Sequence, residues 1–224
     1  MERSQSVAQQ SALRESALAT NKVLRNTYLL LAATLAFSAA TAGAALAFDL
    51  PHPGLVITLV GYFGLLFAVH KTAHSAAGLL WVFALTGFMG YTLGPIIGAY
   101  LKFVPNGHAV VTNAFAVTAV TFTGLSLYAV KSGRRFSAMG GFLFVGILTA
   151  FLLGLVAAFF DMPALSLAVS AMFVMLMAGL ILYQTGEIVH GGEDNYILAT
   201  VTLYVSLFNL FTSLLQLLGF ASED

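Results

Sequence analysis

Seven long apolar stretches, separated by short polar connections, constrain this sequence more than any other feature. A transmembrane helix needs about 20 predominantly apolar residues, and six of the stretches reach that length unaided. The second stretch is shorter and is expected to borrow residues from its flanks. The seven stretches are residues 28–48, 55–69, 77–101, 109–130, 139–160, 164–183 and 196–219.

The amino-acid composition excludes a soluble fold. Charged residues make up 8% of the chain and hydrophobic residues 59%, whereas soluble domains usually carry about 25% charged residues. One globular core could not hide this much apolar surface from water, so the lipid bilayer must be the solvent. We therefore predict an all-α, polytopic membrane protein folded as a seven-transmembrane-helix bundle.

The polar parts of the chain are too short to form a second domain. The connections at 49–54 and 161–163 are tight turns, so any function must reside in the bundle or in the N-terminal segment. Residues 1–22 are rich in Ser, Gln and Ala and contain few large apolar groups. This composition predicts a flexible, extended tail preceding a transmembrane domain at residues 23–220. The chain has no cysteine and no net charge, so neither disulfides nor nucleic-acid binding is expected.

Lys and Arg predict the orientation, because basic residues are retained on the cytoplasmic side of a membrane. Eight of the nine fall on the same side as the N-terminus if all seven stretches cross, and Lys102 alone falls on the other side. The N-terminus is therefore expected in the cytoplasm and the C-terminus outside. The eight are Arg3, Arg14, Lys22, Arg25, Lys71, Lys131, Arg134 and Arg135.

Small residues recur every fourth position in three of the stretches. In lipid no hydrophobic force joins helices, so close backbone approach at small residues supplies the contact. We expect these ladders to lie at helix–helix interfaces. They are Ala32, Ala36, Ala40 and Ala44; Gly90, Gly94 and Gly98; and Gly146, Ala150, Gly154 and Ala158.

The last stretch carries polar residues at spacings that place them on one helical face: Thr202, Ser206, Asn209, Ser213 and Gln216. A polar face turned to lipid is costly, so this face should point into the bundle. Two interpretations remain open: hydrogen bonding between helices, or the lining of a hydrated path. None of the five is ionisable and no carboxylate lies mid-membrane, so an ion-coupled pump is not expected.

Two histidine-containing patterns are candidates for chemistry. Gln184, Glu187 and His190 share one face if the sixth helix continues past residue 183, and the last two are a candidate pH-responsive pair. The alternative is a solvated helix end followed by a glycine stop at Gly191. His70 has His74 four residues later but no third ligand, so no metal or other cofactor is predicted. No catalytic motif is present, and the chain is not expected to be an enzyme.

Three stretches resemble the Bax inhibitor (TMBIM) superfamily, in particular its bacterial YccA-like branch. The first is Gly87-Phe-Met-Gly-Tyr-Thr-Leu-Gly-Pro-Ile96 and the second is Arg135-Phe-Ser-Ala-Met-Gly-Gly-Phe-Leu143. The third begins with Asn195-Tyr-Ile-Leu-Ala-Thr-Val-Thr-Leu-Tyr, ends at Phe211 and is the most specific of the three. The resemblance covers nearly the whole chain after about residue 20, and it implies a seven-helix fold whose last helix is central.

In channel-like members of this superfamily, two aspartates in the sixth and seventh helices form a pH-sensitive latch on a calcium leak. The matching positions here are Gln184 and Ser206, and neither side chain titrates. Arg135 also stands where many relatives have an acid. The resemblance therefore does not carry a pH-gated leak over to this sequence.

YccA-like members resemble modulators of the membrane-anchored AAA protease FtsH in the bacterial inner membrane. The resemblance thus implies a protein that binds and inhibits an FtsH-type protease, with its N-terminal tail reaching the protease pore. A tightly packed bundle would then resist extraction and occupy the protease through kinetic stability. The alternative is a passive leak for cations, calcium ions or protons, along the polar face of the last helix.

Overall fold

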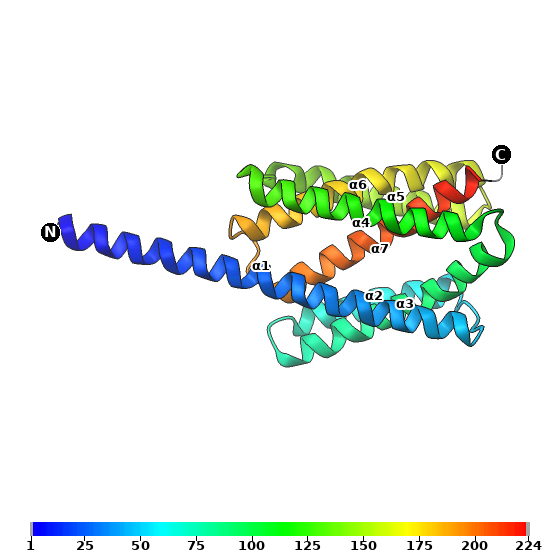
Figure 1. The fold of residues 1–224 in the computed structure, drawn as a ribbon, viewed down its shortest axis with the longest axis horizontal. Helices are drawn as coiled ribbons and strands as arrows, with labels where there is room; N and C mark the ends of the chain where they lie inside the picture. Colours follow the sequence, from blue (N-terminus) through cyan, green and yellow to red (C-terminus); the bar gives the residue numbers. More distant parts are fainter. Residues whose placement is uncertain (1, 223–224) are drawn as a thin grey trace.

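The computed structural model describes the backbone of residues 2–222 and the side chains from Lys22 to Ser222. Within that part the chain forms seven α-helices and a 3₁₀ turn, with no strand (Figure 1). Every helix is long and apolar enough to cross a membrane, as the sequence predicted. The elements are α1 Glu2–Ala47, α2 Leu55–Thr72, α3 Ala76–Phe103, α4 Gly107–Ser132, η1 Ser137–Met139, α5 Gly140–Phe159, α6 Pro163–Val189 and α7 Tyr196–Phe220.

Asp and Asn residues make the sharp turns at the end opposite the N-terminus. Asp49, Asn106 and Asp161 adopt positive φ values of 49°, 53° and 50°, a conformation that Asn and Asp tolerate better than other side chains. Pro163 comes two residues after Asp161 and lies in the first turn of helix α6. At that position the N–H group that proline lacks would be unpaired anyway. Local chemistry thus fixes these hairpins.

Helix α7 lies at the centre of the bundle. It packs against α1, α3, α4 and α6, and Figure 1 shows it crossing obliquely between a group formed by α1–α3 and a group formed by α4–α6. In the most apolar stretch of α7, 61% of the residues are buried, whereas in that of α2 only 6% are buried. The central last helix implied by the family resemblance is therefore present.

The glycine ladder of α3 packs against α1, as expected. A methyl group added to Gly94 would lie 2.6 Å from the backbone oxygen of Ala42, and one on Gly98 would lie 3.0 Å from Leu46. One on Gly90 would collide with the backbone of Ser38. The absence of side chains at these positions lets the two backbones approach closely, which is the main source of attraction between helices in lipid.

The alanine ladder of α1 does not lie at a buried helix–helix interface, contrary to the prediction. Ala32, Ala36, Ala40 and Ala44 are all exposed, and α1 instead buries Leu31, Thr34, Ser38, Ala42 and Ala45. The physical reason is that Thr34 and Ser38 carry hydroxyl groups, which are more costly to turn toward lipid than alanine methyl groups. In the ladder of α5, Gly146 and Gly154 pack against α6 and Ala150 is fully buried, but Ala158 is exposed.

The N-terminal segment is helical in place of the extended chain we expected. Helix α1 begins at Glu2 and runs without a break to Ala47, so residues 2–21 project beyond the bundle (Figure 1). Ala, Gln, Leu and Arg in this segment are good helix formers. Continuing a helix that the membrane already holds also avoids the cost of nucleation. The division of the chain at residue 22 remains a prediction.

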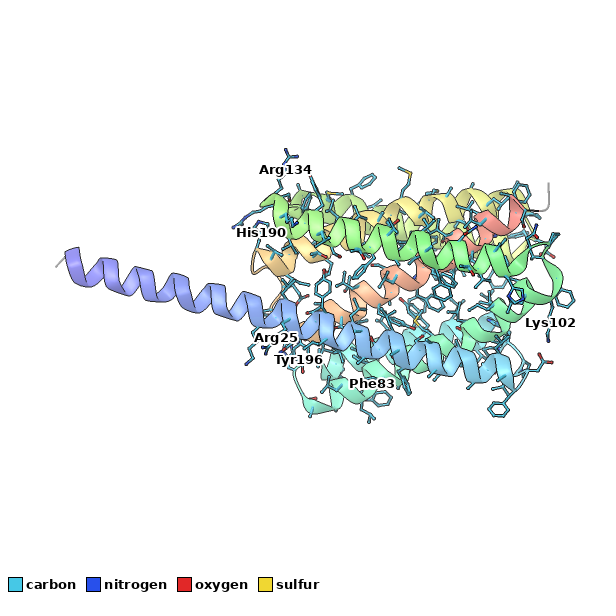
Figure 2. All side chains as sticks on the ribbon, viewed as in Figure 1. Arg25, Phe83, Lys102, Arg134, His190 and Tyr196 are labelled. Carbon is cyan, nitrogen blue, oxygen red and sulfur yellow. The ribbon has the colours of Figure 1, made fainter. Side chains whose placement is uncertain are left out.

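Basic side chains lie at both ends of the bundle. Figure 2 shows Arg25 and Arg134 at the end from which α1 projects, and Lys102 at the opposite end. There Lys102 forms an ion pair of 2.6 Å with Asp49, in the turn after α1. The start of α1 and the end of α7 lie at opposite ends of the molecule (Figure 1), as seven crossings require.

Candidate functional site

The five polar residues of α7 lie within the bundle. Ser206 is fully buried and Ser213 nearly so, and the other three are half-buried. Ser206 donates a hydrogen bond to the Thr202 carbonyl at 2.7 Å, and Asn209 donates one to the Val205 carbonyl at 2.8 Å. Both acceptors belong to α7 itself, so neither bond joins two helices.

Gln216 is the member of this face that joins two helices. Its Nε2 donates to Ser166 Oγ and its Oε1 accepts from Ser170 Oγ, both at 2.6 Å. The two serines are one turn apart on α6, so a single amide ties two turns of that helix to α7. Of the two interpretations of the polar face, hydrogen bonding between helices describes this position.

Replacing Gln216 with leucine should destabilise the α6–α7 contact modestly. Hydrogen bonds between membrane helices average about 0.6 kcal/mol, so losing two predicts a decrease of about 1 kcal/mol in unfolding free energy. Thr212→Val is the matched control, because Thr212 bonds only to carbonyls of its own helix. Unfolding in mixed micelles, followed by circular dichroism, would measure both; equal losses would contradict the assigned role of Gln216.

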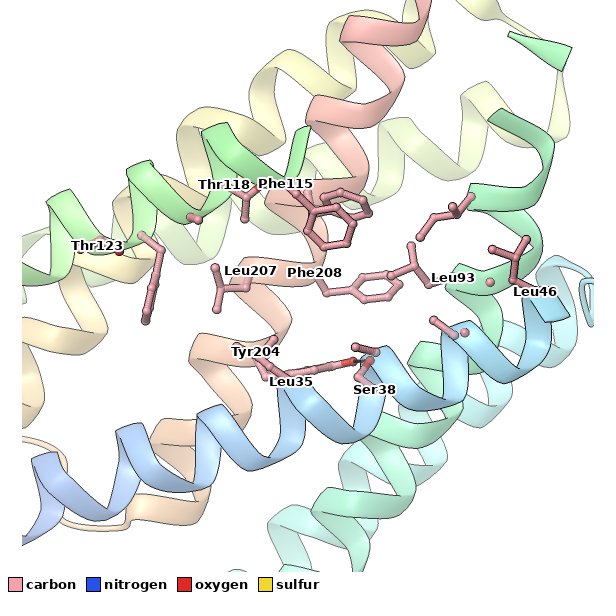
Figure 3. Close-up of a pocket in the computed structure, with 18 residues that line it drawn as sticks. Leu35, Ser38, Leu46, Leu93, Phe115, Thr118, Thr123, Tyr204, Leu207 and Phe208 are labelled. Atoms are coloured by element: carbon pink, nitrogen blue, oxygen red, sulfur yellow. Dashed lines mark hydrogen bonds between the residues drawn. The ribbon is translucent and has the colours of Figure 1, made fainter. Parts of the chain in front are cut away.

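A large cavity lies on the opposite face of α7. It has a volume of about 560 Å³ and is lined by residues of α1, α3, α4 and α7. Figure 3 shows Tyr204, Leu207 and Phe208 projecting from α7 into it. At 100° per residue, these side chains point roughly opposite to Ser206 and Asn209. The cavity and the predicted polar path therefore lie on different sides of the same helix.

The two positions matched to the family latch, Gln184 and Ser206, are both buried. Gln184 is 5% exposed and its Nε2 has no hydrogen-bond partner. Tyr28 contacts Thr185 at 3.4 Å, and the Thr27 carbonyl accepts a hydrogen bond from Thr200 at 3.2 Å. The assignment of Gln184 and Ser206 to the latch positions stays a prediction.

The pattern at the end of α6 has a different partner from the one predicted. The helix does continue, to Val189, and His190 caps it. His190 Nδ1 lies 2.8 Å from the Gly186 carbonyl, and Nε2 lies 3.3 Å from the Gly133 carbonyl in the connection after α4. Among the residues that the structure describes, His190 and Glu187 form no ion pair. His190 therefore connects the end of α6 to the loop that follows α4. Its role as a pH-responsive group stays a prediction.

Asn195 is a structural residue that reasoning from sequence missed. Its Oδ1 accepts from the N–H groups of Ile197 and Leu198 at 2.9 and 3.2 Å, which caps the start of α7. Its Nδ2 donates to the Ala73 carbonyl at 3.0 Å, in the turn between α2 and α3. The available signal was an Asn directly before an apolar run, which is a typical helix start.

His70, in the last turn of α2, and His74, just after that helix, have different partners. His70 Nδ1 contacts the Leu66 carbonyl of its own helix at 2.9 Å, and His74 Nδ1 lies 3.4 Å from the Asn195 amide. Within the described part of the chain, no three His, Asp or Glu side chains gather closely enough to hold a metal ion.

Comparison with known proteins adds the family. Residues 20–223 match the family model described as inhibitor of apoptosis-promoting Bax1. The chain is 51% identical over 212 residues to the "Modulator of FtsH protease YccA" of Escherichia coli strain K12, covering 94% of this chain and 95% of that protein. It is also 51% identical over 212 residues to the "Inner membrane protein YccA" of Escherichia coli O6:H1, with the same coverage.

A more distant relative is similar over the same length. An uncharacterized membrane protein of Vibrio cholerae is 41% identical over 211 residues, covering 94% of each chain. Matches of this extent leave no part of the bundle outside the shared fold. The chain is therefore a seven-helix membrane protein that belongs to the Bax inhibitor family.

Proposed function

We propose that this protein resides in the bacterial inner membrane with its N-terminus in the cytoplasm, where it binds and modulates an FtsH-type membrane-anchored protease. The observation that carries the proposal is the 51% identity, over 94% of the chain, to a protein named as a modulator of FtsH protease. In this proposal the chain acts by binding and not by catalysis.

The shape of the chain supports this proposal. Residues 2–21 extend α1 beyond the bundle at the end that carries Arg25 and Arg134. They reach about 30 Å if they stay helical. Such a segment can be gripped by a protease pore, because it lies beyond the bundle (Figure 1). The membrane-embedded remainder of α1 is packed along the glycines of α3, which opposes extraction.

Deleting residues 2–20 should abolish the effect of the protein on protease turnover. The assay combines the purified protein and an FtsH-type protease in the same proteoliposomes, and it measures the degradation rate of a fluorescent substrate. Wild-type protein is expected to slow degradation, and the deletion variant should leave the rate at that of the protease alone. The physical reason is that no other part of the described chain projects from the bundle.

A substitution on the exposed face of α1 provides the control. Ala36→Leu leaves the N-terminal segment intact and should inhibit as wild type does, while both variants should insert normally in a membrane-fractionation assay. Inhibition that persists in the deletion variant would contradict the proposed mechanism. Calcium flux measured in vesicles without the protease distinguishes protease binding from the alternative, a passive cation leak. A protein that only binds the protease would produce no flux.

A further inference from the structure

We propose that the groove between α1 and α4, on the face of α7 that carries Tyr204, binds one acyl chain of a membrane phospholipid. The groove is the 560 Å³ cavity described above. This proposal goes beyond protease modulation and does not depend on it, because it rests only on the geometry of the transmembrane bundle.

The groove opens sideways into the bilayer. Helices α1 and α4 are not packed against each other; they meet through the rings of Tyr28 and Phe122, whose centres are 5.9 Å apart. Beyond that contact the helices leave the groove open, and its rim residues Leu35 and Phe115 are exposed (Figure 3). An acyl chain can therefore enter laterally from the surrounding lipid without any helix moving.

The chemistry of the groove selects hydrocarbon. Its buried polar groups already bond to each other: Ser38 Oγ donates to Tyr204 OH at 2.6 Å, and Tyr204 OH donates to the Thr86 carbonyl at 3.2 Å. Thr118 Oγ1 donates to the Ala114 carbonyl at 2.7 Å. A polar ligand would find no unpaired buried partner here, and burying its own polar groups would be costly.

The length of the groove suits one acyl chain. Along α1 the lining runs from Leu35 to Leu46, which is about 16 Å at 1.5 Å per residue. The hydrocarbon core of a bilayer is about 30 Å thick, so the groove is about as long as the acyl chains of one leaflet are deep.

The depth of the groove identifies the source of that chain. All of its walls belong to membrane-spanning helices, and the lining of α1 lies in the half of the helix nearer to Asp49 and Lys102. Lipid is the solvent at that depth. An empty groove would leave Leu207, Phe208 and Phe211 without contacts on one side and would forfeit dispersion energy. A phospholipid of the leaflet at the Lys102 end supplies the missing contacts.

The test uses a phosphatidylethanolamine that carries a diazirine within one acyl chain. The full-length protein is reconstituted in vesicles with this lipid, irradiated, digested and analysed by mass spectrometry. We expect label on Leu207 and Phe211 of α7, which are buried in the bundle and line the groove. The exposed Phe142 of α5 reports labelling by surrounding lipid and serves as the internal reference.

Tryptophan at Ala39 of α1 or at Ala119 of α4, which both line the groove, should remove most of the α7 label and leave the Phe142 label unchanged. Ala36→Trp is the matched control, because Ala36 is exposed on α1 but does not line the groove. Absence of α7 label in the wild type, or equal labelling in Ala39→Trp and Ala36→Trp, would overturn the proposal. So would a photoreactive residue at position 119 that crosslinks to a protein in native membranes, since a partner helix would then occupy the groove.

Discussion

Replacing Gly90 with alanine is expected to lower the unfolding free energy by about 3 kcal/mol, at the upper end of the range for overpacking. The added methyl group would collide with the Thr41 hydroxyl and with the Ser38 backbone on α1. A backbone cannot move aside as a flexible side chain can, so α1 and α3 would have to separate. The loss would extend to Tyr204, because Ser38 is its hydrogen-bond partner.

The experiment compares Gly90→Ala with Gly124→Ala. Gly124 lies on α4, and a methyl group there would meet nothing within 4 Å. This control should be neutral or slightly stabilising, because alanine favours helix over glycine by about 1 kcal/mol. Unfolding by SDS in mixed micelles, monitored by circular dichroism, measures the difference. Equal stability of the two variants would show that close approach at Gly90 does not hold α1 to α3.

Replacing Asn195 with alanine should have a comparable effect, a loss of about 2–4 kcal/mol. Removing the cap of α7 costs about 1 kcal/mol. The buried carbonyl of Ala73 also loses its donor, which adds about 1–3 kcal/mol. Both losses fall on one residue because Asn195 uses its oxygen for α7 and its nitrogen for the turn between α2 and α3.

Asn195→Asp separates the two contributions. The carboxylate keeps the oxygen that caps α7 and suits the positive end of the helix dipole, but it cannot donate to the Ala73 carbonyl. We therefore expect a loss smaller than that of Asn195→Ala in the same unfolding assay. If the aspartate variant were as stable as wild type, the bond to Ala73 would contribute nothing and the predicted role of the amide nitrogen would be wrong.

The fold could be predicted from sequence because lipid imposes a simple rule on every segment. Each spanning segment must be long, apolar and helical, so hydropathy alone located all seven helices. The ends were less predictable: α6 extends to Val189 although the apolar pattern stops near residue 183. The extra turns carry Gln184, whose burial depends on neighbouring helices and cannot be read from its own segment.

The candidate site was predicted less completely, because spacing identifies a face but not what the face meets. The ladders of α1 and α3 have the same four-residue period, yet Gly94 is buried at an interface and Ala40 is exposed. Spacing grouped Gln216 with the other polar residues of α7, but its serine partners on α6 follow only from the three-dimensional register. The groove could not be predicted at all, since it is formed by four helices that are distant in sequence.

The uninterrupted course of α1 has a mechanical consequence. From Glu2 to Ala47 it is one rod of 46 residues, about 69 Å long. A pull on its free end acts parallel to the seam with α3, so the load is shared by Gly90, Gly94 and Gly98 together instead of opening them one after another. Such shearing geometry resists force more strongly than peeling does, and a motor that grips this end meets its greatest resistance at the first step.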